Sequence, residues 1–361
     1  APRLRDGLAT AEEVAEAKKS PLHIRPPHRR LIHDNYAMDA IRRDLEIILE
    51  KENIQLGGLT IVTTIDQNLQ EVAERSLDSR LRSVERRPGY RHQTRSIWQG
   101  KPAGQRGAPA YLQGAVVVIE NQSGAVRAVV GGRDADESKF NRAQLAKRPV
   151  GSIFKPFVYL AAFDRGLRPA TMLEDGPLRP GEIKYAPSDW SPENSDGKYR
   201  RLVSAHDALI HSRNTSSVRV GDLAGMENVA DMAKMAFNRK IPKKASSYLG
   251  PWDATPWEVA SAYSLFPNGG IRYRPYLISE IRDGDKVLYS TKPLPFRAAR
   301  AGAAWTTSTL LEETARSGTG SAIRSTYQFN APVGGKTGTT NDYHDAWFAG
   351  YSSSVSCAVW V

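Results

Sequence analysis

Cysteine is almost absent from this 361-residue chain, which holds only Cys357. A single thiol excludes an internal disulfide framework and a cysteine-rich metal site. Because Cys357 lies in the apolar run SSVSCAVWV, we interpret it as a small core residue and not as a nucleophile. The seven histidines are scattered, and His206 and His211 are not four residues apart, the spacing that shares a helix face. We therefore expect no metal site and no cofactor.

Long apolar runs are also missing. No stretch approaches the roughly 18 uninterrupted apolar residues of a membrane helix, and no signal peptide opens the chain. The first residues, APRLRDGLATAEEVAEAKKS, already have helical character, and the last four, AVWV, stop inside a strand-like run. Both ends therefore predict a piece of a longer protein.

Acidic residues are outnumbered, with 39 Asp and Glu against 50 Lys and Arg, for a formal net charge of +11. Such a balance indicates either an anionic neighbour or a basic, solvated surface. The basic residues cluster in 21–43 and 80–106. No helix-turn-helix, RNA-recognition or zinc-finger motif accompanies them, so nucleic acid is not an expected partner.

Apolar periodicity divides the chain into segments of helix and strand. Loops are expected over 86–110 and 170–200. Strands early, helices in the middle and strands last predict one sheet whose two ends meet, flanked by a helical lobe. The expected helices cover 8–19, 34–52, 67–85, 152–164, most of 204–265 and 307–320. The expected strands cover 59–66, 333–340, 345–351 and 355–361, with two hairpins at 114–132 and 269–290.

The stretch RPVGSIFKPF places Ser152 and Lys155 three residues apart where a glycine gives way to an apolar run. At this spacing the two side chains share one face of a helix. A serine hydroxyl needs a base to become a nucleophile, and a lysine can be that base once its pKa falls. A second copy of the pattern, SDGK from Ser195 to Lys198, lies in a polar Asp-Gly turn and is interpreted as a solvated loop.

Two further motifs follow in order. Ser212-Arg213-Asn214 is a Ser-x-Asn turn that sets a hydroxyl and an amide on one side of a cleft. Lys336-Thr337-Gly338 is expected on an edge strand, where Gly338 lets a substrate lie close. The order Ser-x-x-Lys, Ser-x-Asn, Lys-Thr-Gly is the signature of the penicillin-binding proteins and serine β-lactamases.

The resemblance extends over nearly the whole chain and is to class A, bifunctional penicillin-binding proteins. It rests on FNRA, GSIFKPFVYLAA, SRNT, LGPWDATPWEVASAYSLFPNGG, GGKTGTTNDYHDAWFAGY and GGLTIVTTIDQNLQEVAE. It implies an α+β fold, an α/β/α sandwich in which a five-stranded antiparallel sheet is flanked by helices. It also implies a C-terminal remnant of a glycosyltransferase domain at 1–20, a linker at 21–58 and a C-terminally truncated transpeptidase domain at 59–361.

The resemblance implies a role for each motif residue. Ser152 is the nucleophile that becomes acylated, and Lys155 is its base. Ser212 relays a proton to the leaving amine, Asn214 holds the substrate amide, and Lys336 supplies positive charge.

Substrate binding is implied in the same way. Thr337 and Thr339 bind the substrate carboxylate beside Gly338, and the backbone N–H groups of Ser152 and Thr339 form the oxyanion hole. The substrate is a peptidoglycan stem peptide ending in D-Ala-D-Ala, on glycan derived from lipid II. An amine of a second stem takes the acyl group and forms a cross-link, and β-lactams acylate the same serine. The parent protein is expected at the outer face of the bacterial cytoplasmic membrane, held there by an N-terminal anchor.

This sequence departs from the family pattern in several places. The glycosyltransferase core with its catalytic glutamate, the membrane anchor, the usual Gly-x-Asp after the last strand and the closing helix are not in it. This chain alone is therefore not expected to polymerise glycan. A D,D-carboxypeptidase, a serine β-lactamase-like hydrolase and a β-lactam sensor that acylates without turnover remain as alternatives.

Aromatic residues raise a last question. In DAWFAGY we expect Phe348 in the core, and Trp347 is either core or a substrate platform. Tyr185, Trp190 and Tyr199 lie in expected loops, where they line a cleft or are simple surface aromatics.

Overall fold

The computed structural model describes residues 10–12, 15, 35–54, 57–340 and 344–361. The chain divides into two units, Ala1–Asp34 and Asn35–Val361, and almost all described residues belong to the second. The helix expected over 8–19 therefore falls largely outside the described residues.

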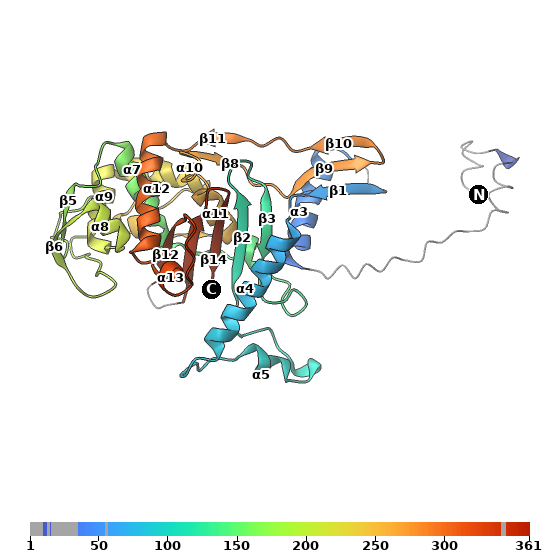
Figure 1. Ribbon diagram of the computed structural model, residues 1–361, viewed down its shortest axis with the longest axis horizontal. Helices are drawn as coiled ribbons and strands as arrows, with labels where there is room; N and C mark the ends of the chain where they lie inside the picture. Colours follow the sequence, from blue (N-terminus) through green and yellow to red (C-terminus); the bar gives the residue numbers. More distant parts are fainter. Residues whose placement is uncertain (1–9, 13–14, 16–34, 55–56, 341–343) are drawn as a thin grey trace. The chain divides into compact units, whose positions relative to one another are not determined.

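A five-stranded antiparallel sheet organises the second unit (Figure 1). Strand β14, near the end of the sequence, pairs with the early strand β2, so the predicted meeting of the two ends is confirmed. The α+β fold with this sheet is confirmed as well. In spatial order the strands are β12 (Gly334–Thr339), β13 (Ala346–Tyr351), β14 (Val355–Trp360), β2 (Ala115–Glu120) and β3 (Val126–Val130).

Both faces of this sheet are covered, which explains the unbroken apolar run of β2. Val117 and Ile119 point into the larger core under the helical lobe. Val116 and Val118 alternate with them and pack on the opposite face against α4 (Gln67–Glu85). Cys357 also packs in that smaller cluster, so its interpretation as a core residue is confirmed.

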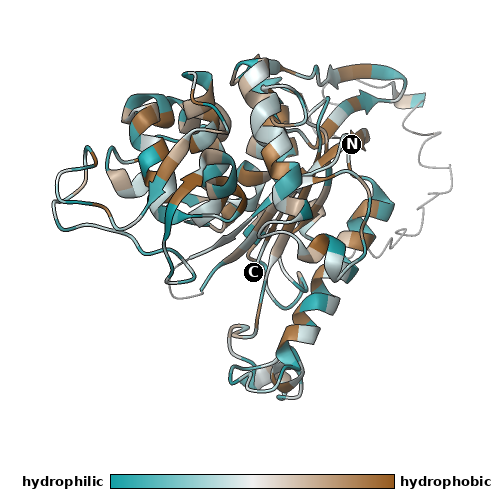
Figure 2. Ribbon diagram, turned by 60° about the vertical axis from the view of Figure 1, so that its left-hand side comes forward, coloured by the Kyte–Doolittle hydropathy of each residue, from teal (hydrophilic) through white to brown (hydrophobic). Residues whose placement is uncertain are grey.

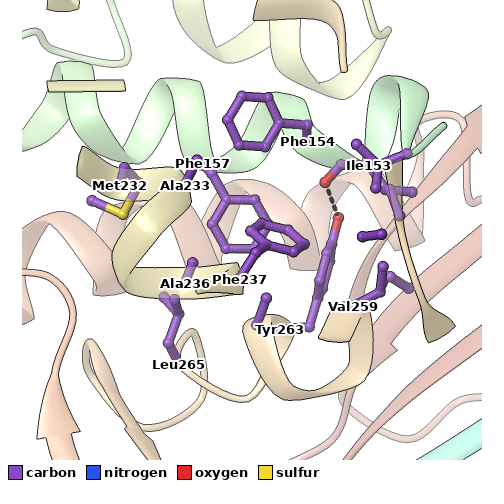
Figure 3. Packing of buried hydrophobic residues seen from close by; sticks show 14 of the residues in the cluster. Ile153, Phe154, Phe157, Met232, Ala233, Ala236, Phe237, Val259, Tyr263 and Leu265 are labelled. Carbon is purple, nitrogen blue, oxygen red and sulfur yellow. Dashed lines mark hydrogen bonds between the residues drawn. The ribbon is translucent and has the colours of Figure 1, made fainter. Parts of the chain in front are cut away.

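The helical lobe is centred on a cluster of aromatic rings (Figure 3). Phe157 packs against Phe237 and Tyr263, with ring centroids 4.7 and 5.4 Å away. Burying each such side chain stabilises the fold by about 1.5–3 kcal/mol. Tyr263 also donates a hydrogen bond of 2.7 Å to the carbonyl of Ile153, which fixes the turn that carries Ser152. The helices are α7 (Lys155–Asp164), α8 (Ala205–Ile210), α9 (Asn214–Ala224), α10 (Met226–Phe237), α11 (Pro256–Tyr263) and α12 (Ala301–Arg316).

A smaller sheet adjoins this body and changes one expectation. It contains β1 (Leu59–Thr63), β9 (Ile278–Asp283) and β10 (Lys286–Ser290). The single hairpin expected over 269–290 is wrong in extent, because β8 (Ile271–Tyr273) pairs instead with β11 (Pro295–Arg297). Pro275 lies between β8 and β9 and offers no backbone N–H, which favours the interruption.

The two expected loops contain regular structure. Within 86–110 lies α5 (Arg95–Gln99), and within 170–200 lies β5 (Met172–Asp175), which pairs with β6 (Arg200–Ser204). Both elements are too short to show a clear period in sequence. The remaining elements are α3 (Tyr36–Lys51), α6 (Arg142–Leu145), α13 (Ala322–Ser325) and the paired β4 (Arg148–Pro149) and β7 (Asp253–Ala254).

Helix α3 lies in the segment assigned to a linker, yet it belongs to the second unit. Its Ala37, Ala40 and Ile41 are buried in the larger core. Among the described residues, no helix is both long enough and apolar enough to span a membrane.

Candidate active site

Ser152 lies in a short 3-10 turn, Gly151–Phe154, and α7 begins only at Lys155. The expectation of one helix starting at Ser152 is therefore wrong by three residues. Gly151 has φ +56°, a conformation that side chains disfavour. Its N–H donates to Gly250 O at 2.8 Å. A Cβ on Gly151 would lie 3.1 Å from the carbonyl oxygen of Thr339, so this turn sits beside the end of β12.

Lys155 is fully buried and joins the first motif to the second. Its Nζ donates to the Ser212 carbonyl at 2.7 Å and to Asn214 Oδ1 at 2.6 Å, and lies 3.2 Å from Ser212 Oγ. Burial lowers its pKa well below the ordinary value, and the charges of Lys336 and Arg213 lower the pKa further. A neutral amine has one lone pair, which the Ser212 hydroxyl can meet as a donor. The pair is therefore arranged to pass a proton.

The direct contact expected between Ser152 and Lys155 is not formed. No hydrogen bond to the Ser152 hydroxyl occurs within the part of the chain that the structure describes. Ser152 is half-buried at the surface of the turn. The lysine faces Ser212 and Asn214, and the serine hydroxyl is left for a ligand.

Ser212 adopts a left-handed backbone conformation, with φ +56°, which is uncommon for a residue other than glycine. The adjacent Arg213 holds this turn in place. Its Nε donates to Asp175 Oδ2 at 2.9 Å, and a second nitrogen contacts Asp196 Oδ2 at 2.8 Å. Because one guanidinium spans two carboxylates, the Ser-x-Asn motif is locked between α8 and α9.

Asp175, at the end of β5, was missed in the sequence because it lies in a segment that predicts a loop. It is fully buried and also accepts from Thr215 Oγ1 at 2.9 Å and from Asn194 Nδ2 at 2.9 Å. Burial alone would raise its pKa, but the hydrogen bonds from Arg213 and its neighbours outweigh burial, so the pKa is lowered. An ionised carboxylate therefore sits beneath the Ser-x-Asn turn.

The second Ser-x-x-Lys copy forms an exposed turn, as expected. It also has a structural use that its sequence did not reveal. Asp196 and the carbonyl of Lys198 both accept from Arg213, so SDGK helps to hold the Ser-x-Asn motif and offers no buried lysine to Ser195.

Lys336 is the second buried lysine, and burial lowers its pKa to about 7. Its Nζ donates to Thr319 Oγ1 at 3.3 Å and to the Thr337 carbonyl at 3.0 Å. The Thr337 hydroxyl donates to the same Thr319 oxygen at 2.9 Å. Thr319, in the loop after α12, is thus a shared acceptor for two predicted site residues, and the motif search did not find it.

The loop around Thr319 also connects the two sides of the site. The Thr319 N–H donates to the Ile210 carbonyl at 3.2 Å, and Ile210 ends α8 two residues before Ser212. A Cβ on Gly318 would lie 2.6 Å from that carbonyl oxygen, so only glycine allows the approach. Thr319 therefore fixes β12 against the segment that carries the Ser-x-Asn motif.

β12 lies at an edge of the five-stranded sheet, as expected, and its side chains alternate in burial. Lys336 and Gly338 are buried, whereas Thr337 is half-buried and Thr339 is exposed. A Cβ on Gly338 would lie 2.8 Å from Ile153 Cγ2 and would press on the turn that carries Ser152. The space that this glycine leaves is thus filled by the protein itself, and its part in substrate binding stays a prediction.

The aromatic residues that were candidates for a substrate platform or cleft lining differ in burial. Trp347 is 3 % exposed, and its Nε1 donates to the Pro149 carbonyl at 3.0 Å, so it is a core residue and not a platform. Trp190 packs against the larger core. Tyr185 and Tyr199 are exposed. Within the described residues, no group of three or more His, Cys, Asp or Glu side chains is placed to hold a metal ion.

We expect a Lys336→Met variant to be more stable than the parent at neutral pH. The folded lysine releases its proton near pH 7, whereas an unfolded lysine keeps it to about pH 10.4. Between these values the unfolded chain binds more protons, so the stability of the parent rises with pH. The free energy of unfolding of the variant lacks this rise with pH. The shift is worth at most about 5 kcal/mol, less what the two lost hydrogen bonds contribute.

Urea unfolding of both proteins from about pH 6 to about pH 10 measures the difference in free energy of unfolding. It should be largest at the acid end and shrink as the pH rises. Parallel pH curves for the two proteins would show that Lys336 is not titrating as its burial requires.

Comparison with known proteins places the chain among relatives. The family model described as the penicillin binding protein transpeptidase domain matches residues 114–361. Penicillin-binding protein 1A of Neisseria lactamica is 37% identical over 69% of this chain and 32% of its own length. Its counterpart in Rickettsia conorii is 27% identical over 97% of the chain and 56% of its own length. The chain thus spans between about a third and just over half of these relatives.

Among solved structures, penicillin-binding protein 1A from Haemophilus influenzae superposes with a TM-score of 0.77 at 22% identity. The match covers 99% of this chain and 70% of that one. At this identity the likeness concerns the fold, and it includes the sheet and helical lobe described above.

Proposed function

This chain belongs to the penicillin-binding protein transpeptidase family, and from that premise we propose that it is a serine D,D-transpeptidase whose nucleophile is Ser152. The substrate is a peptidoglycan stem peptide that ends in D-Ala-D-Ala. The observation that carries the proposal is Lys155, a buried lysine with a lowered pKa beside the Ser152 turn, bound to Ser212 and Asn214. A lysine whose pKa is lowered in this way can lose its proton more easily and act as a general base.

The first half-reaction forms an ester on Ser152. Its Oγ attacks the carbonyl carbon of the penultimate D-Ala while neutral Lys155 takes the hydroxyl proton. The backbone N–H groups of Ser152 and Thr339 stabilise the oxyanion. As the peptide C–N bond breaks, the proton passes from Lys155 through Ser212 to the departing amine of the terminal D-Ala. The products are free D-Ala and the acyl-enzyme.

The second half-reaction transfers the acyl group. An amine of a neighbouring stem attacks the ester carbonyl and gives up a proton to Lys155. As the ester C–O bond breaks, Lys155 returns that proton to Ser152 Oγ, which leaves a free serine and a new amide cross-link. Asn214 holds the substrate amide, and Lys336, Thr337 and Thr339 bind the terminal carboxylate during acylation. A β-lactam acylates Ser152 in the same way, but its leaving group stays attached.

The larger protein is proposed by extension. Residues 59–361 form the transpeptidase domain, 1–20 are the end of a glycosyltransferase domain, and 21–58 link the two. The family resemblance supports this division, although α3 packs with the second unit. The parent is proposed to polymerise glycan as well and to be held at the outer face of the cytoplasmic membrane.

A synthetic stem peptide ending in D-Ala-D-Ala, supplied with an amine acceptor, tests the reaction. We expect free D-Ala together with the transferred product. Free D-Ala with only the hydrolysed peptide would make the protein a carboxypeptidase, and rapid release of hydrolysed penicillin would make it a β-lactamase. A stable penicillin adduct without any peptide turnover would favour a sensor.

We expect a Thr319→Val variant to react more slowly with penicillin, because Lys336 and Thr337 lose their shared acceptor. The second-order rate of acylation should fall by about tenfold, which corresponds to one charge-assisted hydrogen bond. The methyl ester of the same penicillin should be less affected, since it has no carboxylate to bind.

The matched control is Thr306→Val on α12, whose hydroxyl donates to the Gly302 carbonyl of its own helix at 2.9 Å and to no other group in the described part of the chain. It should leave both rates unchanged. Equal losses for acid and ester in the Thr319 variant would mean that Thr319 does not act through carboxylate binding.

A further inference from the structure

The far half of α4 and the loop after it form a projecting lobe with charge of one sign. We define the basic lobe as residues 75–106; Figures 1 and 2 both show α4 reaching away from the sheet, with α5 near its far end. Its exposed charged side chains are all cationic. They are Arg75, Arg80, Arg82, Arg86, Arg87, Arg91, Lys101 and Arg106.

The acidic side chains of this region form ion pairs within the protein. The lobe holds two carboxylates, Asp78 and Glu85, whose side chains are 20% and 7% exposed. Arg133 binds them at 2.9 and 2.6 Å, and it is itself 1% exposed. Arg95 contacts Asp78 and pairs with Glu137 below the surface. The lobe is thus held together by ion pairs that leave the partly exposed Asp78 as the one acidic side chain of the lobe near its cationic surface.

The surface cations have few acidic partners, although Arg106 donates to the carbonyls of Lys101 and Gln99 and Arg80 lies over the ring of Tyr327. Within the described residues, Arg82 is the one member of the eight that forms an ion pair, with Asp78 at 2.6 Å. Arg75, Arg82 and Arg86 recur at helical spacing on one face of α4. With Ser79, Ser83 and the carboxylate of Asp78, which is paired with Arg82, they line an open hollow of about 520 Å³. Guanidinium groups and hydroxyls together suit the oxygens of a phosphate ester.

The side chains of the lobe distinguish among the classes of anionic partner that it could bind. A protein interface is built around an apolar or aromatic centre, and the large exposed apolar side chain in 75–106 is Ile97 alone. Single-stranded nucleic acid binds on several exposed rings, whereas in the lobe Trp98 is buried, Tyr90 is half-buried and His92 is the one exposed ring. What remains is a broad array of point charges, which matches a plane of phosphate headgroups. We propose that the basic lobe docks on a bilayer that carries anionic phospholipids.

The proposal concerns a contact made by the transpeptidase unit itself and does not depend on the reaction at Ser152. Association should be electrostatic, and it should therefore weaken as salt shortens the range of the interaction. The exposed Ile97 can enter the boundary between headgroups and acyl chains, as single apolar residues of interfacial helices do.

Sedimentation of the whole chain with lipid vesicles tests the proposal. Vesicles of phosphatidylcholine with phosphatidylglycerol should bind the protein at about 50 mM salt and release it at about 500 mM, whereas phosphatidylcholine alone should not bind it. The variant Arg86→Glu/Arg87→Glu/Arg91→Glu should bind more weakly by a factor on the order of a hundred. None of these arginines forms an ion pair within the described chain, so the fold should persist.

The matched control is Arg165→Glu/Arg168→Glu/Arg201→Glu, three exposed arginines outside the lobe. It changes the net charge by the same amount and should bind vesicles nearly as the parent does. Both variants should keep their penicillin acylation, which shows that the active site is intact. Equal losses in the two variants would overturn the proposal, as would undiminished binding by the lobe variant. Tighter binding of polyglutamate than of vesicles at equal charge would assign the lobe to an acidic protein instead.

Discussion

A Ser152→Ala variant is expected to form no covalent penicillin adduct while it stays folded. Its hydroxyl makes no hydrogen bond within the described residues and lies at the surface of its turn, so losing it should change the free energy of unfolding little. Ser195→Ala is the matched control, because Ser195 heads the same four-residue pattern in an exposed turn without a buried lysine. Labelling with a fluorescent penicillin, read on a denaturing gel, compares both variants with the parent.

The expected outcome is complete loss of label for Ser152→Ala and full label for Ser195→Ala. Label retained by a folded Ser152→Ala protein would contradict the assignment of the nucleophile. Circular dichroism of each variant separates a lost nucleophile from a lost fold.

Replacing Lys155 should slow acylation by about 10²–10⁴-fold, the usual contribution of general-base catalysis. Lys155→Arg keeps a positive charge but cannot become neutral. Lys155→Met keeps the length and apolar packing of the side chain and removes the base. Both variants are needed because each has its own side effect. Arginine is larger than the buried lysine that it replaces, and methionine leaves Ser212 and Asn214 without their hydrogen-bond donor.

The pH dependence gives a further check on Lys155. Only the neutral lysine can accept the proton of Ser152, and burial lowers its pKa. The acylation rate of the parent should therefore fall as the pH is lowered through that depressed pKa and should be level above it. A folded Lys155→Met protein that acylates near the parent rate would show that another group is the base.

The motifs and the sheet could be predicted because both give patterns among residues that are close together in the sequence. Val117 and Val118 point to opposite faces of a covered strand, and that double burial appears as an unbroken apolar run. Ser152 and Lys155 were found because a glycine, a serine and a lysine stand at the start of such a run. Their spacing is fixed by the chain and needs no knowledge of the remaining fold.

The supporting residues could not be predicted, because their partners are distant in sequence. Asp175 binds Arg213 across 38 residues, and Thr319 binds Lys336 across 17. Neither has a local pattern that separates it from a surface residue. The expected contact between Ser152 and Lys155 was wrong because it depended on tertiary structure. The Ser-x-Asn turn, distant in sequence, supplies the hydrogen-bond acceptors of the lysine.

The most direct test of the central claim is to map the penicillin adduct on the unaltered protein. Trypsin does not cleave the Arg148–Pro149 and Lys155–Pro156 bonds, so Ser152 is expected in a peptide covering 148–165, and Ser195 in a separate one covering 185–198. A serine acyl-enzyme at Ser152 predicts that the penicilloyl mass appears on the first peptide and that fragmentation places it on Ser152. An adduct on the second peptide, or no adduct on any serine, would contradict the claim.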